Sequence, residues 1–366
     1  MVCARRRVAT LEHRDLKQPR IRAGASRKRK WKSRCKTHQL RDMVGEAAVA
    51  MLTLLASAVT PTVDLTSGVL PGATVKMPIL AAGTAGYKGA DATAAVQGAI
   101  AAGFSHIHTA FDYYNLPAIG AALKGIPRDS IFVSTMTSPC VHAAPPKRNV
   151  TDAASCYNLT MTEAKAAVAS LGLERVDLLM LHGPSEAFGH VGPCSALACK
   201  LNAAQWRAYG DLLTAGVASA IGVSNYCQSC LSCLGGHDPV HTPAVNQIQV
   251  HVGQGSGDPG GGLLSYCAKR GIVVQAYEPL AGGALVTDDD CATIGTAHNK
   301  SAAQVALRWV LQRAPSLVVR AGSAAHLVQD LDVTDFTLND AELETLDRKT
   351  SPPGEAGGRC SWGCTE

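Results

Sequence analysis

The stretch RVDLLMLH, at residues 175–182, decides the fold class that this sequence predicts. Its centre, 178–181, is apolar at every position rather than at every second one. A strand of this kind is covered on both faces, as in a parallel sheet flanked by helices. The Ala-rich segment before it, 160–173, begins with Thr160 and Glu163 in the spacing of a capping box. We therefore predict a helix that leads into a buried parallel strand.

The same alternation of helix and strand extends in both directions from this unit, over residues 70–350. Apolar and β-branched runs predict strands over 78–86, 105–110, 129–136, 175–182, 218–225, 244–251, 272–279 and 316–322. Helical segments are predicted over 91–103, 116–125, 160–173, 203–216, 227–235, 262–271, 302–314, 323–331 and 339–349. Eight strand–helix units in roughly 260 residues predict an α/β fold, a single (β/α)8 TIM barrel. A doubly wound open sheet is the alternative, but no G-x-G-x-x-G follows the first strand.

The segments outside the barrel differ from it in charge and composition. Residues 1–42 hold 15 of the 34 Lys and Arg but only three acids, whereas the rest of the chain has a net charge of −7. We interpret 1–42 as a disordered basic arm or upstream extension and do not expect it to bind nucleic acid. The segment 43–61 has the apolar run and small-residue site of a signal peptide that starts at Met43. A transit peptide and a buried helix are the alternatives for it, and 351–366 is expected to be a flexible, Cys-containing tail.

Other features of the sequence favour the secretory pathway or the extracellular space, with the plastid or cytoplasm as alternatives. Eleven of the 13 cysteines lie beyond residue 100, and many are close in sequence: Cys140 and Cys156, Cys194 and Cys199, Cys227, Cys230 and Cys233, and Cys360 and Cys364. Crowded cysteines in a secreted chain usually form disulfides. Sequons for N-glycosylation begin at Asn149, Asn158 and Asn299. No apolar run reaches the roughly 18 residues of a membrane span.

The segment CQSCLSCLGGH, 227–237, allows three interpretations. Its C-x2-C-x2-C-x3-H spacing is that of a metal site, and its C-x-x-C pairs are those of a redox site. In an oxidising compartment we instead expect structural disulfides to neighbouring loops and no metal. The connectivity cannot be read from the sequence, and an odd number of cysteines leaves at least one outside intrachain pairs.

Polar residues at the carboxyl ends of barrel strands are the candidates for an active site. We expect these side chains to converge there: His108, Tyr113, Met136, His182, Ser224, Asn225, Gln247, His251 and Tyr277. Asp112, which precedes Tyr113, is a further candidate to point into the site. The segment 137–159, with three prolines, follows the third strand at the same end and is expected to form a long loop.

Several of these stretches resemble segments of the aldo-keto reductases, in the same order and at similar spacing. They are GFSHIHTAFDYYN, RVDLLMLHGP, AIGVSNY, PAVNQIQVH and IVVQAYEPL. The resemblance covers roughly 70–350 and implies a (β/α)8 barrel that reduces aldehydes and ketones with NADPH. It also implies a small-molecule carbonyl substrate, but it does not indicate the oligomeric state. The stretch GATVKMPIL, at 72–80, resembles the hairpin that closes the family's barrel.

The resemblance places catalytic roles on particular residues. The family uses an Asp, a Tyr, a Lys and a His, and its motif D-T-A-x-x-Y puts the proton-donating tyrosine at Tyr113. The histidine falls on His182, while His108 stands at the aspartate position and Met136 at the lysine position. A nearby Lys⁺ lowers the pKa of a tyrosine, and an aspartate compensates the buried lysine charge. Because both members of this pair are replaced together, no stranded charge remains.

Two functions follow from the altered tetrad. In the first, the protein is an NAD(P)H-dependent oxidoreductase in which Tyr113 is the general acid and His108 polarises it or relays its proton. An imidazole titrates near neutral pH and can be a cation in that role. In the second, Tyr113 keeps an ordinary pKa near 10, and the protein is a catalytically silent barrel that binds a nucleotide or metabolite. A Cys-based redox protein is a third alternative, and we expect Met136 to serve in packing.

The resemblance also assigns contacts with the cofactor. Side chains at the positions that bond the nicotinamide carboxamide are Ser224, Asn225 and Gln247, and Tyr277 matches the aromatic residue that stacks on the ring. The adenine-side contacts would be Gly322, Ser323, His326 and Gln329.

A few further positions bear on the choice of cofactor and on the width of the substrate pocket. The usual Lys and Arg for the 2′-phosphate are missing, apart from His326 and Arg320, and Glu278 stands where a small Ser is common. The resemblance implies NADPH, and the missing contacts for the 2′-phosphate leave NADH as the alternative. Ala85 and Gly183 occupy positions at which the family commonly has aromatic residues, which implies a more open substrate pocket.

Overall fold

The computed structural model describes residues 60–142, 147–186, 193–235, 242–255, 259–320 and 322–352. The described residues all belong to one compact unit of the chain, Ala58–Glu366. The basic arm predicted over 1–42 lies outside the described residues, as do the predicted signal peptide apart from 60–61 and the predicted tail apart from 351–352.

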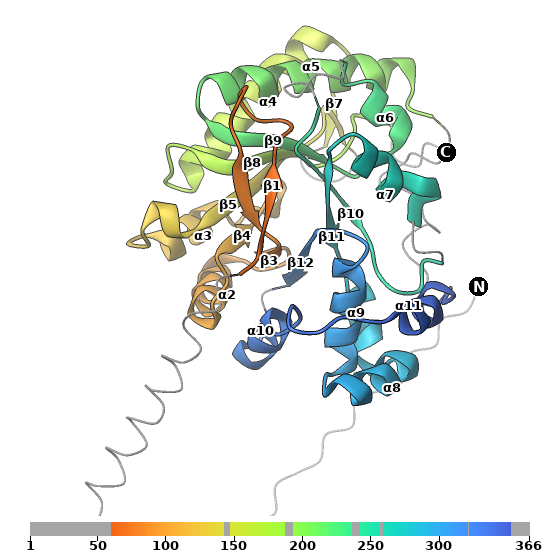
Figure 1. The fold of residues 1–366 in the computed structure, drawn as a ribbon. Coiled ribbons are helices and arrows are strands. Elements are labelled where there is room, and N and C mark those ends of the chain that lie inside the picture. Colours follow the sequence, from red (N-terminus) through yellow and green to blue (C-terminus); the bar gives the residue numbers. More distant parts are fainter. Residues whose placement is uncertain are drawn as a thin grey trace, which may run out of the picture. The chain divides into compact units, whose positions relative to one another are not determined.

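Eight parallel strands close into a barrel, which confirms the predicted (β/α)8 fold (Figure 1). In chain order they are β3 (Leu80–Gly83), β4 (His106–His108), β5 (Phe132–Thr137), β8 (Val176–Leu181), β9 (Ala218–Ser224), β10 (Val245–Gln249), β11 (Val273–Tyr277) and β12 (Ser316–Arg320). The ring closes where β12 pairs in parallel with β3, Leu317 lying opposite Leu80. The central unit of the prediction, β8, is buried at five of its six positions because β5 and β9 flank it and helices cover its outer side.

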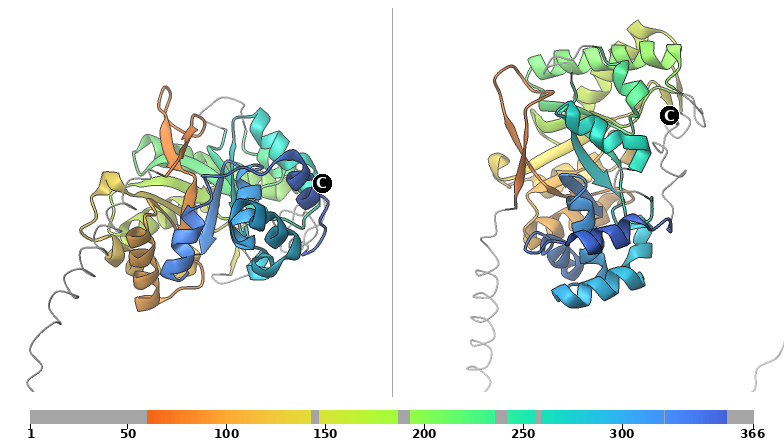
Figure 2. Two further views of the ribbon diagram at one scale, coloured as in Figure 1. Left: turned by 60° about the horizontal axis from the view of Figure 1, so that its bottom comes forward. Right: turned by 45° about the vertical axis from the view of Figure 1, so that its right-hand side comes forward.

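The described helices lie outside the strands, as the two further views show (Figure 2). They are α2 (Gly89–Ala102), α3 (Leu116–Leu123), α4 (Ala153–Ser170), α5 (Ala196–Thr214), α6 (Gln228–Ser232), α7 (Pro259–Lys269), α8 (Asp289–His298), α9 (Ala302–Leu311), α10 (Ala324–Leu331) and α11 (Asp340–Asp347). Three short 3-10 helices are η1 (Phe111–Tyr113), η2 (Arg128–Ser130) and η3 (Ala281–Thr287). No helix within the described ranges has the length and apolarity that a bilayer span requires.

An antiparallel hairpin precedes the barrel, as the stretch at 72–80 predicted. It consists of β1 (Thr62–Leu65) and β2 (Val75–Pro78). Leu65 and Met77 are buried in a cluster with the first residues of β5, β10 and β11, namely Phe132, Val245 and Val273. Since these strands begin at the amino end of the barrel, the hairpin covers that end and leaves the carboxyl end to the loops.

Helix starts were the least accurate part of the prediction. Helix α4 begins at Ala153, within the segment expected to be a loop, because the Asp152 side chain caps it by accepting from the backbone N–H of Ser155 at 2.8 Å. The remainder of that segment includes a small hairpin of β6 (Val141–His142) and β7 (Arg148–Asn149). Helix α8, which the sequence analysis did not predict, is capped in the same way by Asp288.

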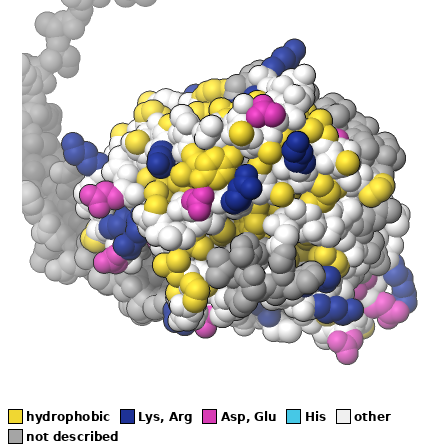
Figure 3. All heavy atoms as spheres, turned by 90° about the horizontal axis from the view of Figure 1, so that it is seen from above, with side chains coloured by type: hydrophobic (Ala, Val, Ile, Leu, Met, Phe, Trp, Pro, Cys, Tyr) yellow, Lys and Arg dark blue, Asp and Glu magenta, His cyan; other side chains and the backbone are white. Residues whose placement is uncertain are grey.

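Charged side chains are dispersed on the face of the molecule that Figure 3 presents. Basic and acidic groups stand singly among apolar and uncharged atoms, and the described part of this face has no continuous basic area.

Candidate active site

The predicted site residues stand at the carboxyl end of the barrel, opposite the hairpin. His108 ends β4, His182 directly follows β8, Ser224 ends β9 and Tyr277 ends β11. Tyr113 ends the single turn η1, which begins three residues after β4. Strand ends that are distant in sequence are neighbours here because parallel pairing aligns their carboxyl ends.

The turn η1 is fastened to the loop after β3. Asn115 donates from Nδ2 to the carbonyl oxygens of Thr84 at 2.9 Å and Tyr87 at 3.2 Å, and it accepts from the Thr109 hydroxyl at 3.1 Å. Tyr114 adopts the left-handed conformation, with φ 54°, and so ends the turn. These contacts fix the direction in which the residues of η1 project.

Tyr113 and His182 lie beside each other. Their ring centroids are 5.6 Å apart and the rings meet edge to face, at 77°. The backbone of His182 is held from two sides: its N–H donates to Thr137 at 2.8 Å, and its carbonyl accepts from Asn225 Nδ2 at 2.9 Å. A phenol and an imidazole are therefore adjacent at the mouth of the barrel.

Asp112 also points into this site. Its two carboxylate oxygens lie 2.9 and 2.8 Å from Nδ1 of His182, and the two side chains are only 8 and 13% exposed. The sequence analysis placed Asp112 beside the site but did not pair it with a partner. The position of Asp112 in the sequence could have indicated this contact, because the residue directly before Tyr113 is held by the same turn.

His108 is buried inside the barrel within a chain of polar groups. Its Nδ1 lies 3.0 Å from the Ser134 hydroxyl, which is also 2.8 Å from Nε2 of His106, and its Nε2 lies 3.4 Å from Nε2 of Gln247. Burial, followed by the nearby charges of His106 and His182, lowers the pKa of His108 well below its ordinary value. The imidazole is therefore neutral at neutral pH, and the cationic role considered for it in the sequence analysis does not fit this environment.

Met136 belongs to the apolar cluster that also contains Leu65 and Met77 of the hairpin, and Tyr113 packs against this cluster. Met136 is completely buried there with Ala110 and Met180. Burial raises the pKa of Tyr113 above its ordinary value of 10, and the negative charge of Asp112 raises it further. Tyr113 is thus a protonated phenol across the physiological pH range, with no amine from position 136 beside it.

The predicted nicotinamide-binding residues form one connected set. Tyr277 donates its hydroxyl to Asn225 Oδ1 at 2.9 Å, and Asn225 Nδ2 lies 3.1 Å from the Ser224 hydroxyl. Ser224 donates to the backbone carbonyl of Gln247 at 2.9 Å, and the Gln247 side chain donates to Gln275 at 2.7 Å. These amides and hydroxyls are groups of the kind that hydrogen-bond a carboxamide, and here they bond one another and the backbone next to the half-buried ring of Tyr277. The set fits a nicotinamide.

The predicted adenine-side residues are exposed and lie beyond β12, the strand between β11 and β3. They are Gly322, Ser323, His326 and Gln329. Ser323 caps α10 by accepting from the backbone N–H of His326 at 3.3 Å. Arg320, the last residue of β12, stacks its guanidinium 4.8 Å from the ring centre of Tyr87. The remaining candidate, His251, is buried after β10 and contacts the carbonyl of its neighbour Val252 through Nδ1.

Disulfides connect the loops around this end of the barrel. Cys140, after β5, pairs with Cys156 of α4. Two further bridges, Cys194–Cys230 and Cys199–Cys233, join the loop and helix after β8 to the short helix α6 after β9. Their Cα–Cα distances, between 4.9 and 5.7 Å, lie in the usual range for disulfides.

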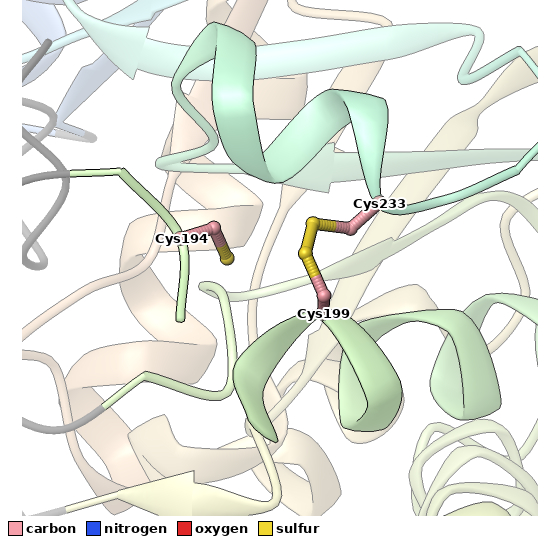
Figure 4. Close-up of side chains that lie close together, drawn as sticks. All are labelled: Cys194, Cys199 and Cys233. Atoms are coloured by element: carbon pink, nitrogen blue, oxygen red, sulfur yellow. A yellow bond between two sulfur atoms is a disulfide. The ribbon is translucent and has the colours of Figure 1, made fainter. Parts of the chain in front are cut away.

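The structure thus favours the disulfide interpretation of the segment 227–237. Figure 4 shows the Cys199–Cys233 bridge with Cys194 beside it, and the sulfurs of these three residues lie within 4.8 Å of one another. His237, the histidine of the metal-like spacing, lies outside the described residues. The pairing of these two bridges was not predictable, because each joins the connection after β8 to the connection after β9.

Comparison with known proteins agrees with this architecture. The family model described as "Aldo/keto reductase family" matches residues 80–351. An aldo-keto reductase of Mycobacterium ulcerans is 31% identical over 275 residues, covering 74% of this chain and 86% of the relative. The morphine 6-dehydrogenase of Pseudomonas putida is 30% identical over 303 residues, covering 78 and 90%. A crystal structure of an aldo/keto reductase from Brucella melitensis superposes with a TM-score of 0.63 at 27% identity, covering 79% of this chain and 99% of that one. The chain therefore belongs to the aldo/keto reductase family.

Proposed function

We propose that this protein reduces an aldehyde or ketone with NADPH, or with NADH in its place, at the carboxyl end of the barrel. The observation that carries the proposal is the meeting of the Tyr113 and His182 rings, 5.6 Å apart, beside the amide and hydroxyl groups that fit a nicotinamide. Membership of the family supports the same reaction class. The cofactor supplies the hydride, and the protein supplies position and protons.

The binding residues would divide the work of holding the cofactor. Ser224, Asn225 and Gln247 would bond the carboxamide, and the ring of Tyr277 would stack on the nicotinamide so that one face is presented to the substrate. Gly322, Ser323, His326 and Gln329 would contact the adenosine side. A 2′-phosphate would be met by His326 and Arg320 and repelled by Glu278, so the discrimination between NADPH and NADH is expected to be weak.

Two protein groups would face the carbonyl oxygen. Tyr113 retains its proton and can donate a hydrogen bond to that oxygen. The general-acid role predicted for it from the sequence would also require it to release that proton. The imidazole of His182, which lies beside the Tyr113 ring, would approach the same oxygen. Ala85 and Gly183, at positions that are often aromatic in the family, support a substrate with a bulky group beside its carbonyl.

A catalytically silent barrel that binds a nucleotide or metabolite is the second candidate function. The completely buried Met136, at the position of the family's lysine, favours it, because nothing there lowers the pKa of Tyr113. The double variant His108→Asp/Met136→Lys separates the two functions. A gain of carbonyl reduction from an inactive parent would support the silent barrel, and a loss from an active parent would support the altered site.

Cofactor binding and turnover test the proposed reaction in sequence. Adding NADPH or NADH is expected to quench the protein fluorescence, and Tyr277→Ala is expected to weaken this binding about tenfold, since stacking on an aromatic ring contributes on the order of 1 kcal/mol. Mixing the NADPH complex with an excess of each aldehyde in a panel should then remove the dihydronicotinamide absorbance in a single turnover. Binding without any turnover across the panel would contradict the proposal.

We also infer that the protein passes through the secretory pathway. The three disulfides support this, because such bonds persist in oxidising compartments. The sequon residues Asn149, Asn158 and Asn299 are all exposed. Mass spectrometry of the protein from its native source, before and after reduction, is expected to show at least three disulfides and one or more N-glycans. Fully reduced cysteines together with unmodified sequons would refute this location.

A further inference from the structure

The feature that the proposed function leaves unexplained is the contact between Asp112 and His182. Both carboxylate oxygens of Asp112 lie within 2.9 Å of Nδ1 of His182. An ionised carboxylate can only accept hydrogen bonds, so Nδ1 must carry a proton. The second ring nitrogen, Nε2, lies on the opposite edge of the imidazole. The only proton of His182 that can be exchanged without breaking this contact is therefore the one on Nε2.

The surroundings of the pair explain why a proton donor is needed here. Tyr113 has no amine beside it, because Met136 is apolar and buried at the lysine position. Burial and the charge of Asp112 both raise the pKa of the phenol, which makes Tyr113 a poorer acid than an ordinary tyrosine. His108 is neutral and bonded within the barrel to Ser134 and Gln247. The carboxylate of Asp112 supplies a negative charge that would balance an imidazolium at His182.

We propose that His182 donates the proton in carbonyl reduction, and that Asp112 is the positioning residue that holds its ring and stabilises its charged form. Tyr113 then contributes a hydrogen bond to the carbonyl oxygen rather than the proton. This inference rests on the proposed reductase function and assigns its acid. Asp112 does for His182 what a buried aspartate does for the histidine of a serine protease: it fixes the tautomer and compensates the imidazolium.

Carbonyl reduction at this site requires the transfer of one hydride and one proton. The carbonyl carbon gains a C–H bond by accepting hydride from the dihydronicotinamide, and is thereby reduced while the nicotinamide is oxidised. The π pair of the C=O bond moves to oxygen, which takes the proton from Nε2 of His182. The imidazole is left neutral, still donating Nδ1–H to Asp112, and regains its proton from water. In alcohol oxidation the same Nε2 accepts the hydroxyl proton, so no tyrosinate is required.

The titratable groups around His182 set the pH range of this step. Asp112 contacts it from η1, Tyr113 lies edge to face beside it, and His108 interacts with it electrostatically from β4. Glu278, after β11, acts on Tyr113. An imidazole ordinarily titrates near pH 6.5, whereas a phenol with a raised pKa does not titrate between pH 5 and 9. Since the pKa of Tyr113 is raised, a decline of the rate between pH 5 and 9 would have to come from a group other than this phenol.

The kinetic test compares Asp112→Asn with Tyr113→Phe over pH 5 to 9. We expect Asp112→Asn to lower kcat for reduction about 100-fold or more and to move its decline to lower pH, with NADPH binding unchanged within about twofold. Tyr113→Phe should lower kcat only about tenfold and keep the pH at which the wild-type rate declines. If Asp112→Asn leaves the pH profile unchanged and Tyr113→Phe removes turnover, the phenol is the acid and this assignment is overturned.

A measurement without cofactor keeps the inference separate from the proposed function. The imidazole NMR signals of His182, assigned by their loss in His182→Gln, should report Nδ1 protonation at all pH values and a smaller doubly protonated fraction in Asp112→Asn than in wild type. Unchanged His182 signals in Asp112→Asn would overturn the pairing. If the wild type binds NADPH but reduces no carbonyl, the proposed function and its acid both fail, while these signals still decide whether Asp112 controls the charge of His182.

Discussion

Replacing His182 with glutamine is expected to lower kcat for carbonyl reduction about 100- to 10,000-fold, the range that a positioned general acid contributes. Glutamine can still form hydrogen bonds at this position, but its amide cannot act as a general acid. The loss should fall on kcat more than on KM, because the proton moves only in the transition state. The measurement is steady-state reduction of the aldehyde that is turned over best, at the pH optimum of the wild type.

His298→Gln is the matched control for this variant. His298 lies on α8 and bonds Glu342 of α11 at 2.8 Å, so the same substitution is made outside the barrel mouth. It should leave kcat unchanged within about twofold while lowering stability slightly, by up to roughly 1 kcal/mol. Equal losses of activity in the two variants would show that His182 acts through folding rather than chemistry.

Introducing a lysine at position 136 is expected to lower the free energy of unfolding by about 3 to 5 kcal/mol. Met136 is completely buried beside Ala110 and Met180, and the neighbouring His108 is neutral, so an ammonium group would have no carboxylate to compensate it there. Met136→Leu keeps the volume and the apolar character, and should cost less than about 1.5 kcal/mol. Urea unfolding of both variants measures the difference.

Adding His108→Asp should recover part of this loss. A carboxylate at position 108 would restore a partner for the lysine. The free energy of unfolding of the double variant should therefore be about 1 to 3 kcal/mol higher than the value obtained by adding the effects of the two single substitutions. A Met136→Lys protein as stable as the wild type, with no coupling in the double variant, would mean that position 136 is open to water or that another acid compensates it. The paired replacement in this chain would then need a different explanation.

The sequence predicted the features that depend on residues close together in the chain better than those that depend on residues far apart in it. Continuous apolar runs such as 178–181 predicted buried parallel strands because each run depends only on its own residues and on burial from both sides. The positions of His182, Ser224 and Tyr277 followed, since strand ends converge in any barrel of this type. Helix starts were less accurate: capping by Asp152 adds a turn and more to α4 within an apparently loop-like segment.

The interactions that give this site its character were not predictable in the same way. The contact between Asp112 and His182 spans 70 residues and depends on the single turn η1, whose direction is set by bonds from Asn115 to the loop after β3. Disulfide connectivity has the same origin, because Cys194 and Cys230 meet only when two barrel loops become neighbours. Similarly, the neutral state of His108 results from burial and not from its residue type.

The most direct test of the central claim is a single turnover with NADPH that carries deuterium at both C4 positions. Enzyme, labelled cofactor and an aldehyde are mixed, and the alcohol is analysed by mass spectrometry. If the barrel mouth places the carbonyl beside the nicotinamide, the alcohol will contain one carbon-bound deuterium, and the His182→Gln protein will form this alcohol at least about 100 times more slowly than the wild type. The mechanism would be contradicted if the cofactor binds but no aldehyde gives labelled alcohol. It would also be contradicted if the His182→Gln protein forms the labelled alcohol as fast as the wild type.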